Sequence, residues 1–355
     1  MNPQTAEEAE LLVESVREFA RSELIEPDRK WDAEESSLAG VLPQLAELGF
    51  MAIRLPESIG GLNCSMLTYS ALLHELAYAS PSVTVTISVH NMVGEVLNQF
   101  GREPLRSRVL SDWSRADQLG AFAISEANAG SDPSSITTRA GRRGGEYVVN
   151  GSKMWITNGV SARWFMTLVR TGEGKEGISA LLIDGAKPGL ERLPIKGKTG
   201  IRGSETVALH LTDVRCPAEN LLGDEGDGLK IALAALDGGR IGIASQATGI
   251  IEACLDEMRR YAPQRVQFNQ PISQFQAIQN MIADTAVELQ AARALTRYAA
   301  RLADAGQPYT AAAARAKLFA SEAANRVAYR AVQVHGGSGY VNECRVERLA
   351  RDARV

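Results

Sequence analysis

Two stretches in the middle of the chain combine hydroxyl groups, small residues and an aromatic ring in a pattern that could bind a flat ligand. The first, FAISEANAGSD, joins a predicted strand to a small-residue loop; its candidate ligand contacts are Phe122, Ile124, Ser125, Gly130 and Ser131. Small residues let backbone N–H groups approach a ligand, and a hydroxyl can donate to a phosphate or carbonyl oxygen. An ordinary loop in which Asp132 caps a turn is the commoner outcome for such a stretch taken alone.

The second stretch, KMWITNG, places Trp155 in the middle of a predicted strand, followed by Ile156 and Thr157. A tryptophan beside a hydroxyl donor suits one face of a flat aromatic cofactor. A tryptophan in the core of a β-sandwich would give the same pattern, so the stretch by itself leaves both interpretations open.

A pair of adjacent glycines, Gly238 and Gly239, interrupts the helical pattern of ALDGGRIGIASQATG. Each glycine costs about 1 kcal/mol relative to alanine inside a helix. The cost indicates either a kink or a ligand lying against the backbone, and Asp237 and Arg240 flank the pair. A kinked helix with a surface ion pair is the alternative.

Two further stretches could reach a phosphate. In YAPQRVQFNQPISQFQ, Arg265 and Gln276 lie on either side of Pro271, which we predict to start a helix. Arginine can pair with a pyrophosphate in a bidentate manner, although a solvated arginine is more common. In VQVHGGSGY a helix ends in a glycine pair, which is ordinary capping but also exposes backbone amides to anions. The candidates here are Gln333, Val334, His335, Gly336 and Gly337.

Composition excludes several classes of protein. The chain has 355 residues, 45% of them hydrophobic, and a net charge of −4, with both signs interspersed. Binding of nucleic acid or membrane through a broad basic surface is therefore not expected. The acidic, amphipathic N-terminus does not resemble a targeting peptide, and no apolar run is long enough to span a membrane. The four scattered cysteines contain no CxxC pair, so we predict a reducing, cytoplasmic environment and no metal site.

The periodicity of apolar residues divides the chain into three sections and predicts an α+β fold. Residues 1–117 read as a helical domain, in which Val83–Ile87 could pass for a strand but continues at helical spacing. Residues 118–215 contain short runs rich in β-branched residues without helices between them, which predicts an antiparallel sandwich or barrel. Residues 216–355 predict a four-helix bundle, with long helices at 229–262, 272–305 and 309–335.

Taken together and in order, these stretches resemble the acyl-CoA dehydrogenase family over the whole chain. The resemblance extends to DVRCPAENLLGDEGDGLKIALAALDGGRIGIASQATGI and to AKLFASEAANRVAYRAVQVHGGSGYVNECRVERLARDARV. It implies an N-terminal helical domain, a middle β-domain and a C-terminal bundle, with FAD between the last two. It also implies a homotetramer in which part of the FAD site comes from a neighbouring subunit.

The resemblance assigns roles residue by residue. Two groups would contact FAD. One comprises Phe122, Ile124, Ser125, Gly130, Ser131, Trp155, Ile156 and Thr157, and the other, from the neighbouring subunit, Arg265, Gln276, Gln333, Val334, His335, Gly336 and Gly337. Contacts with the acyl-CoA would come from Ser131, Asp237, Gly238, Gly239 and Arg240.

The reaction implied is α,β-dehydrogenation of an acyl-CoA to the 2-enoyl-CoA, with electrons passed to an electron-transferring flavoprotein. A glutamate removes the α-proton, which requires a polarised thioester carbonyl and a base of raised pKa. We expect a C4–C5 acyl group, as in fatty acid metabolism or branched-chain amino acid degradation, because TISVHNMVGEVLNQFG is similar to short- and branched-chain members.

No catalytic residue is identified within the chain. Short- and medium-chain members carry the base shortly after RDARV, so we expect it just beyond Val355; long-chain and isovaleryl members use a helix position that here is Gly239. Two alternatives stay open. One is a catalytically deficient subunit of a hetero-oligomer that binds acyl-CoA and FAD, and the other is a flavin oxidase on the same scaffold.

Overall fold

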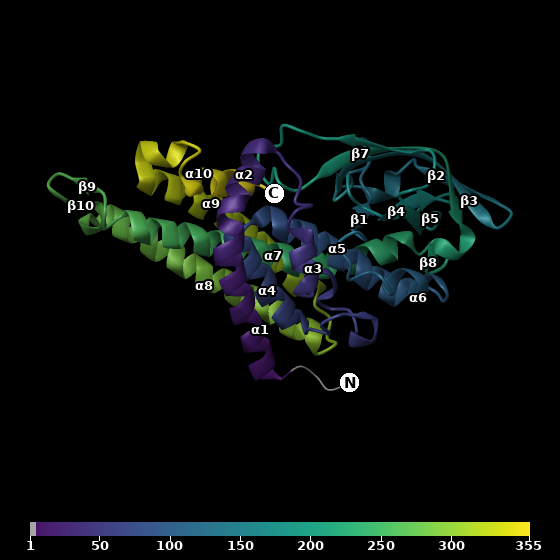
Figure 1. The fold of residues 1–355 in the computed structure, drawn as a ribbon, viewed down its shortest axis with the longest axis horizontal. Coiled ribbons are helices and arrows are strands. Elements are labelled where there is room, and N and C mark those ends of the chain that lie inside the picture. The colour runs from purple at the N-terminus through teal and green to yellow at the C-terminus, as the bar shows by residue number, and fades with distance from the viewer. Residues whose placement is uncertain (1–4) are drawn as a thin grey trace.

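Helices form the first section of the chain in the computed structural model, which describes residues 5–355 (Figure 1). Thr5 begins the first helix with a capping box: its hydroxyl accepts from the Glu8 N–H at 3.2 Å, and the Glu8 carboxylate accepts from the Thr5 N–H at 2.8 Å. The helices are α1 (Ala6–Phe19), α2 (Ile25–Glu34), α3 (Leu42–Glu47), α4 (Met66–Ala79), α5 (Pro81–Phe100) and α6 (Leu105–Leu110).

The segment Val83–Ile87 is helical within α5, as predicted. Its β-branched residues alone would favour a strand, but the start of the helix is strongly specified. Pro81 occupies the first turn, where its missing N–H costs nothing, and the Ser80 hydroxyl accepts from the Val83 N–H at 3.1 Å. Local capping therefore outweighs the strand propensity here.

The middle section forms a sheet whose strand order is β6-β7-β3-β2-β4-β5-β8, with β1 beside β4. The strands are β1 (Gly120–Ala123), β2 (Arg139–Arg143), β3 (Glu146–Thr157), β4 (Trp164–Arg170), β5 (Ile178–Asp184), β6 (Leu190–Pro194), β7 (Thr206–Pro217) and β8 (Leu221–Leu222).

The prediction of a purely antiparallel section was wrong in one respect. Strand β1 pairs parallel with β4, with Gly120 opposite Trp164, and β2 joins β4 in parallel at Arg139 and Arg170. Both strands meet β4 only after β3 has intervened in the chain, so no tight hairpin imposes an antiparallel direction on these pairs. The remaining strand pairs are antiparallel.

Alternation along β4 explains why this strand is buried on both faces. Met166 and Leu168 pack in a core that also contains Val93 and Ile231 from helices. The intervening Phe165 and Val169 instead pack with residues of β3 and β7. One face of β4 thus packs against helices, and its other face packs against side chains of other strands of the sheet.

Three long helices dominate the last section, close to the predicted ranges. They are α7 (Gly228–Tyr261), α8 (Gln276–Asp304) and α9 (Thr310–His335), followed by the short α10 (Arg345–Asp352). Pro271 precedes a short 3₁₀ helix (Ile272–Gln274), and α8 itself begins only at Gln276, a few residues later than predicted. Pro271 also lies in β10 (Gln270–Pro271), which pairs with β9 (Val266–Gln267) in a protruding hairpin (Figure 1). Proline fits there because a short edge strand leaves its missing N–H unneeded.

Contacts between distant segments hold the last section to the first. In α7, the space around Gly249 is so tight that a Cβ there would lie 2.4 Å from the His74 carbonyl oxygen of α4. Ion pairs join α10 to α2, since Arg348 lies 2.7 Å from Asp28 and Arg351 lies 2.6 Å from Asp32. Across the described residues, no helix combines the length and apolar character needed to cross a membrane.

Candidate functional site

A cavity of about 600 Å³ lies where α5, the segment after β1, the end of β3 and the start of α7 meet. It falls within the size range of small-molecule sites. Of the residues predicted from sequence, the structure brings nine together in its wall: Phe122, Ile124, Ser125, Gly130, Ser131, Trp155, Ile156, Thr157 and Arg240.

Trp155 lines this cavity from a distorted position in β3. The pairing of β3 with β7 shifts register between Lys153 and Ile156, and Trp155 has a φ of 63°. A bulge of this kind re-aims a side chain out of the regular alternation of the strand. The indole is 61% exposed, which is unusual for so large an apolar group and indicates a surface that a ligand could cover.

A buried ion pair holds the two halves of this wall in place. Lys153 is fully buried, and its ammonium donates to the Glu126 carboxylate at 2.8 Å and to the Ile124 carbonyl at 3.1 Å. The Met154 N–H donates to the Ser125 carbonyl at 2.8 Å. The strand that carries Trp155 is therefore fixed to the segment that carries Ile124 and Ser125.

The pKa values of this pair follow from burial and proximity. Burial alone would raise the pKa of Glu126, but the Lys153 charge and hydrogen bonds from Thr137 and Thr138 bring it down to about 2. Burial lowers the pKa of Lys153 to about 8, against the opposing effect of Glu126. At neutral pH the pair is charged on both sides.

The helix α7 continues without interruption through the predicted glycine pair. Asp237 forms an ion pair with Arg240 and accepts a hydrogen bond from the Thr310 hydroxyl at 2.5 Å. Gly238 and Gly239 line a second cavity, of about 160 Å³, whereas Arg240 lines the first. The two glycines therefore leave the backbone of α7 accessible beside the second cavity.

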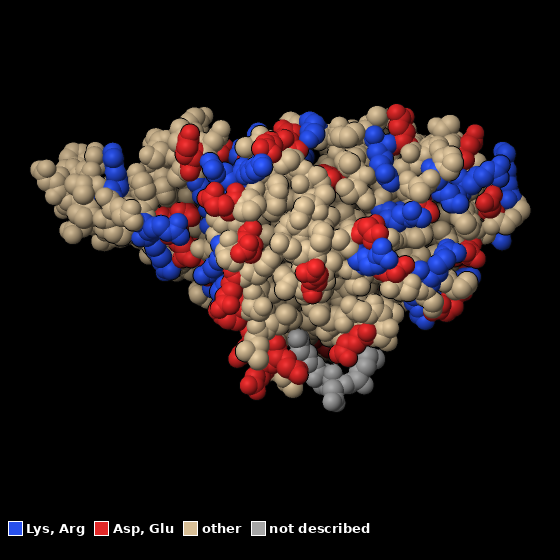
Figure 2. Space-filling model, viewed as in Figure 1, with Lys and Arg blue, Asp and Glu red and all other residues tan. Residues whose placement is uncertain are grey.

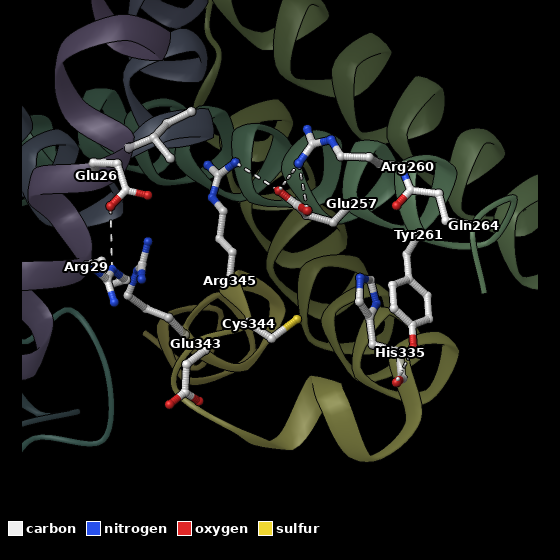
Figure 3. A pocket seen from close by; sticks show the side chains of 12 residues that line it. Glu26, Arg29, Glu257, Arg260, Tyr261, Gln264, His335, Glu343, Cys344 and Arg345 are labelled. Atoms are coloured by element: carbon white, nitrogen blue, oxygen red, sulfur yellow. Dashed lines mark hydrogen bonds and ion pairs between the residues drawn. The ribbon is translucent and has the colours of Figure 1, made fainter.

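The remaining predicted residues lie in another part of the molecule. Gln333, Val334 and His335 form the last turn of α9, and Gly336 follows with φ 60° and ψ −139°, a conformation that favours glycine. His335 stacks on Tyr261, with ring centroids 4.3 Å apart, beside a third cavity of about 340 Å³ (Figure 3). Burial lowers the pKa of His335, and its Nδ1 lies 2.8 Å from the Ala331 carbonyl oxygen.

Figure 3 shows charged side chains around this third cavity: Glu257 lies between Arg345 and Arg260 and pairs with both. Arg265 precedes the β9–β10 hairpin and Gln276 follows it, and both are exposed. In Figure 1 this hairpin and the sheet that contains β3 lie toward opposite ends of the molecule. A single chain thus does not bring the two predicted groups together.

Sequence reasoning did not single out three features of these cavities. Lys175 adds a cation to the wall of the first cavity, from the connection between β4 and β5. The Lys153–Glu126 pair joins residues from different stretches, and local pattern could not pair them. The wall of the second cavity also includes Arg54 and Glu95, which no sequence motif indicated.

The chain belongs to the acyl-CoA dehydrogenase family. Models of the family's N-terminal, middle and C-terminal domains match residues 6–117, 121–214 and 226–355. The mitochondrial short-chain specific acyl-CoA dehydrogenase of Mus musculus is 40% identical over 350 residues, which cover 98% of this chain and 85% of the relative.

Solved structures agree with this assignment. Butyryl-CoA dehydrogenase from Megasphaera elsdenii superposes with a TM-score of 0.95 at 36% identity, covering 100% of this chain and 94% of that one. A chain from a structure described as the electron transferring flavoprotein of Acidaminococcus fermentans gives a TM-score of 0.96 at 37% identity, with the same coverage. The protein is therefore an FAD-dependent oxidoreductase of the acyl-CoA dehydrogenase family.

The residues of the first cavity fit a flavin. An exposed tryptophan offers an apolar face for a flat ring, and the hydroxyl-bearing Ser125 and Thr157 belong to the same wall. A cavity wall that leaves a tryptophan largely uncovered gains by accepting an aromatic ligand.

Proposed function

We propose that the protein catalyses α,β-dehydrogenation of a short- or branched-chain acyl-CoA to the 2-enoyl-CoA. The observation that carries this proposal is the convergence of Trp155, Ser125 and Thr157 with Arg240 on one cavity of a family member. Similarity to short-chain specific and butyryl-CoA dehydrogenases supports a short acyl group. FAD, when bound, supplies the acceptor for the hydrogen removed from the β-carbon.

In this proposal the chain's own residues bind and orient. Trp155 and Phe122 cover the flavin ring, and Ser125 and Thr157 donate hydrogen bonds to its polar edge. Ser131, Arg240 and the Gly238–Gly239 backbone position the acyl-CoA; the arginine is held in place by Asp237, which Thr310 in turn fixes.

We further propose that the active protein is a homo-oligomer, a tetramer by resemblance. Arg265, Gln276 and Gln333–Gly337 do not line the cavity that Trp155 lines, and His335 lies beside a different one, so we propose that they complete the FAD site of a neighbouring copy. The β9–β10 hairpin supports this, because Phe268 is 88% exposed and Figure 2 shows few charges at that tip. A cytoplasmic location, and an electron-transferring flavoprotein as acceptor, are parts of the same proposal.

The test is to purify the full-length protein, measure its flavin spectrum and titrate it with butyryl-CoA and isobutyryl-CoA under anaerobic conditions. We expect bound FAD that is bleached by at least one of these esters and reoxidised by an electron-transferring flavoprotein. Absence of flavin after reconstitution with FAD would contradict the proposal. Rapid oxygen consumption without another acceptor would instead indicate an oxidase.

A further inference from the structure

The second cavity, referred to below as the smaller cavity, adjoins the candidate flavin site. Its wall contains polar and charged groups that a plain acyl chain does not require. It lies between α4, α5, α7 and the connection from α8 to α9, and it has a volume of about 160 Å³. Met92 lines both cavities, and Gly238 and Gly239 form the α7 side of the smaller one. On the proposed function, this is the space for the far end of the acyl group.

An ion pair forms part of the wall of this cavity. The Arg54 Nε lies 3.0 Å from a carboxylate oxygen of Glu95, and 24% of the Arg54 side chain and 32% of the Glu95 side chain remain accessible. Both residues line the cavity, so a ligand there can reach the pair. The Nε and Nη1 atoms of Arg54 are both buried, and neither makes a hydrogen bond of regular geometry among the described residues, although Nε lies within ion-pair range of Glu95, so the guanidinium is incompletely satisfied.

Other hydrogen-bonding groups surround the pair. The Tyr69 hydroxyl lies 3.5 Å from that of Ser88, and both residues line the cavity together with Gln99 and Tyr309. Burial raises the pKa of Tyr69 and of Tyr309, and in both cases the charge of Glu95 adds to the effect. Glu95 and the two tyrosines thus belong to the wall of the same cavity.

The ion pair is not needed to attach α5 to the segment before Arg54. Asn91 already does so: its side-chain amide donates to the Phe50 carbonyl at 2.8 Å and its oxygen accepts from the Ile53 N–H at 2.8 Å. Desolvating an ion pair also costs more than packing apolar side chains of similar size. A cavity that binds a purely apolar acyl end would therefore be expected to have apolar side chains in place of the ion pair.

We propose that this cavity selects a short acyl-CoA whose acyl chain ends in a hydroxyl group, which donates to Glu95 and accepts from Arg54. A hydroxyl fits a neutral ion pair because it is donor and acceptor at once, whereas a carboxylate would face the charge of Glu95. This inference rests on the proposed function and adds the chemistry of the acyl end.

The experiment compares butyryl-CoA with 4-hydroxybutyryl-CoA on the full-length holoenzyme. Dissociation constants come from the change in flavin absorbance, and kcat/KM from reduction of an electron acceptor. We expect kcat/KM for the hydroxylated ester to exceed that for butyryl-CoA by at least about tenfold, because a site built to bind a hydroxyl loses more when it is absent.

Variants locate this preference. Glu95→Leu should remove the preference, so that kcat/KM for the hydroxylated ester no longer exceeds that for butyryl-CoA. The double variant with Arg54→Leu, which avoids an unpaired charge, should do the same. Glu95→Gln keeps a hydrogen-bonding group and should retain most of the preference for the hydroxylated ester. Glu146→Gln is the matched control, because Glu146 pairs with Arg215 on the surface at 3.1 Å, away from the cavities.

Each contrary result has its own meaning. If neither ester perturbs the flavin, the proposed function fails, and this inference fails with it. If both bind and butyryl-CoA is preferred by the wild type, only the hydroxyl preference is refuted. An equal loss for both esters in Glu95→Leu would overturn the recognition role of Glu95 in favour of a structural or catalytic one.

Discussion

The ammonium of Lys153 lies 2.8 Å from a carboxylate oxygen of Glu126, and this contact fixes the strand of Trp155 to the loop of Ser125. Neither residue lines the first cavity, and both side chains are almost completely buried. The pair therefore acts on the candidate site through position alone.

Replacing Lys153 with methionine should destabilise the protein strongly. Glu126 would remain buried without its cation, and breaking a buried pair in this way costs about 3–5 kcal/mol. Denaturant unfolding gives the free energy, and the flavin absorbance of the purified variant reports FAD retention, which should also fall. Arg215→Gln removes one partner of a surface pair, for which about 0–1 kcal/mol is expected. Equal effects of the two changes would contradict the structural role of the Lys153–Glu126 pair.

Replacing Trp155 with alanine should weaken FAD binding with little change in the stability of the FAD-free protein. The side chain is largely exposed, so few protein contacts are lost, whereas an aromatic contact with the flavin is worth about 0.5–1.5 kcal/mol beyond the area it buries. The expected result is an FAD dissociation constant raised by about tenfold, a change of about 1.4 kcal/mol. Fluorescence titration of the FAD-free protein measures it.

Trp155→Phe is the conservative control and should lose much less FAD affinity. If Trp155→Ala retained FAD as well as the wild type does, the indole would not be a flavin contact.

Replacing Gly239 with alanine should raise stability while impairing use of the acyl-CoA. Alanine is favoured in a helix by about 1 kcal/mol. Its Cβ would lie 3.3 Å from the Met92 sulfur, which a flexible side chain can accommodate at the expense of the smaller cavity. The two quantities to measure are the melting temperature and the KM for butyryl-CoA, and both should be higher in the variant than in the wild type.

Gly249→Ala on the same helix provides the opposite case. Its Cβ would lie 2.4 Å from a backbone oxygen, so this variant should unfold at lower temperature despite the same gain in helix propensity. A stabilised Gly249→Ala variant would show that α4 and α7 are less closely packed than the structure indicates.

Replacing Asp352 with asparagine should flatten the pH dependence of stability between about pH 4 and 8. Burial, with the charges of Asp28 and Asp32, raises the pKa of Asp352 to about 7. A carboxyl whose pKa is raised on folding stabilises the folded state below its ordinary pKa of 3.8, and this contribution is lost as pH rises through 7. Asparagine keeps an oxygen that can accept from the Ile201 N–H, now at 2.6 Å.

The measurement is the difference in melting temperature between wild type and Asp352→Asn across that range. Relative to the variant, the wild type should lose up to roughly 4 kcal/mol of unfolding free energy from the acid to the alkaline end, because a shift of one pKa unit is worth about 1.4 kcal/mol. Asp117→Asn, which changes an exposed carboxylate, is the control and should not show this trend. A difference that stayed constant with pH would contradict the raised pKa.

Local pattern predicted the three sections of this chain and their long helices. Helical spacing located α7, α8 and α9 to within a few residues, and short β-branched runs placed the sheet in the middle section, but short elements such as β6, β8 and the β9–β10 hairpin were not predicted. The stretches around Ser125 and Trp155 could be predicted to meet because their motifs match a known family. The start of α8 was misplaced, since Pro271 is compatible with both the first turn of a helix and a short edge strand.

Only the tertiary structure decided which distant residues touch. The left-handed backbone at Trp155, the parallel pairing of β1 with β4, the Lys153–Glu126 contact and the meeting of Arg54 with Glu95 depend on how elements cross in space. Periodicity shows which face of an element is apolar, but it carries no information on which partner covers that face. These contacts required the packed chain, because each joins segments whose local sequences are compatible with many neighbours.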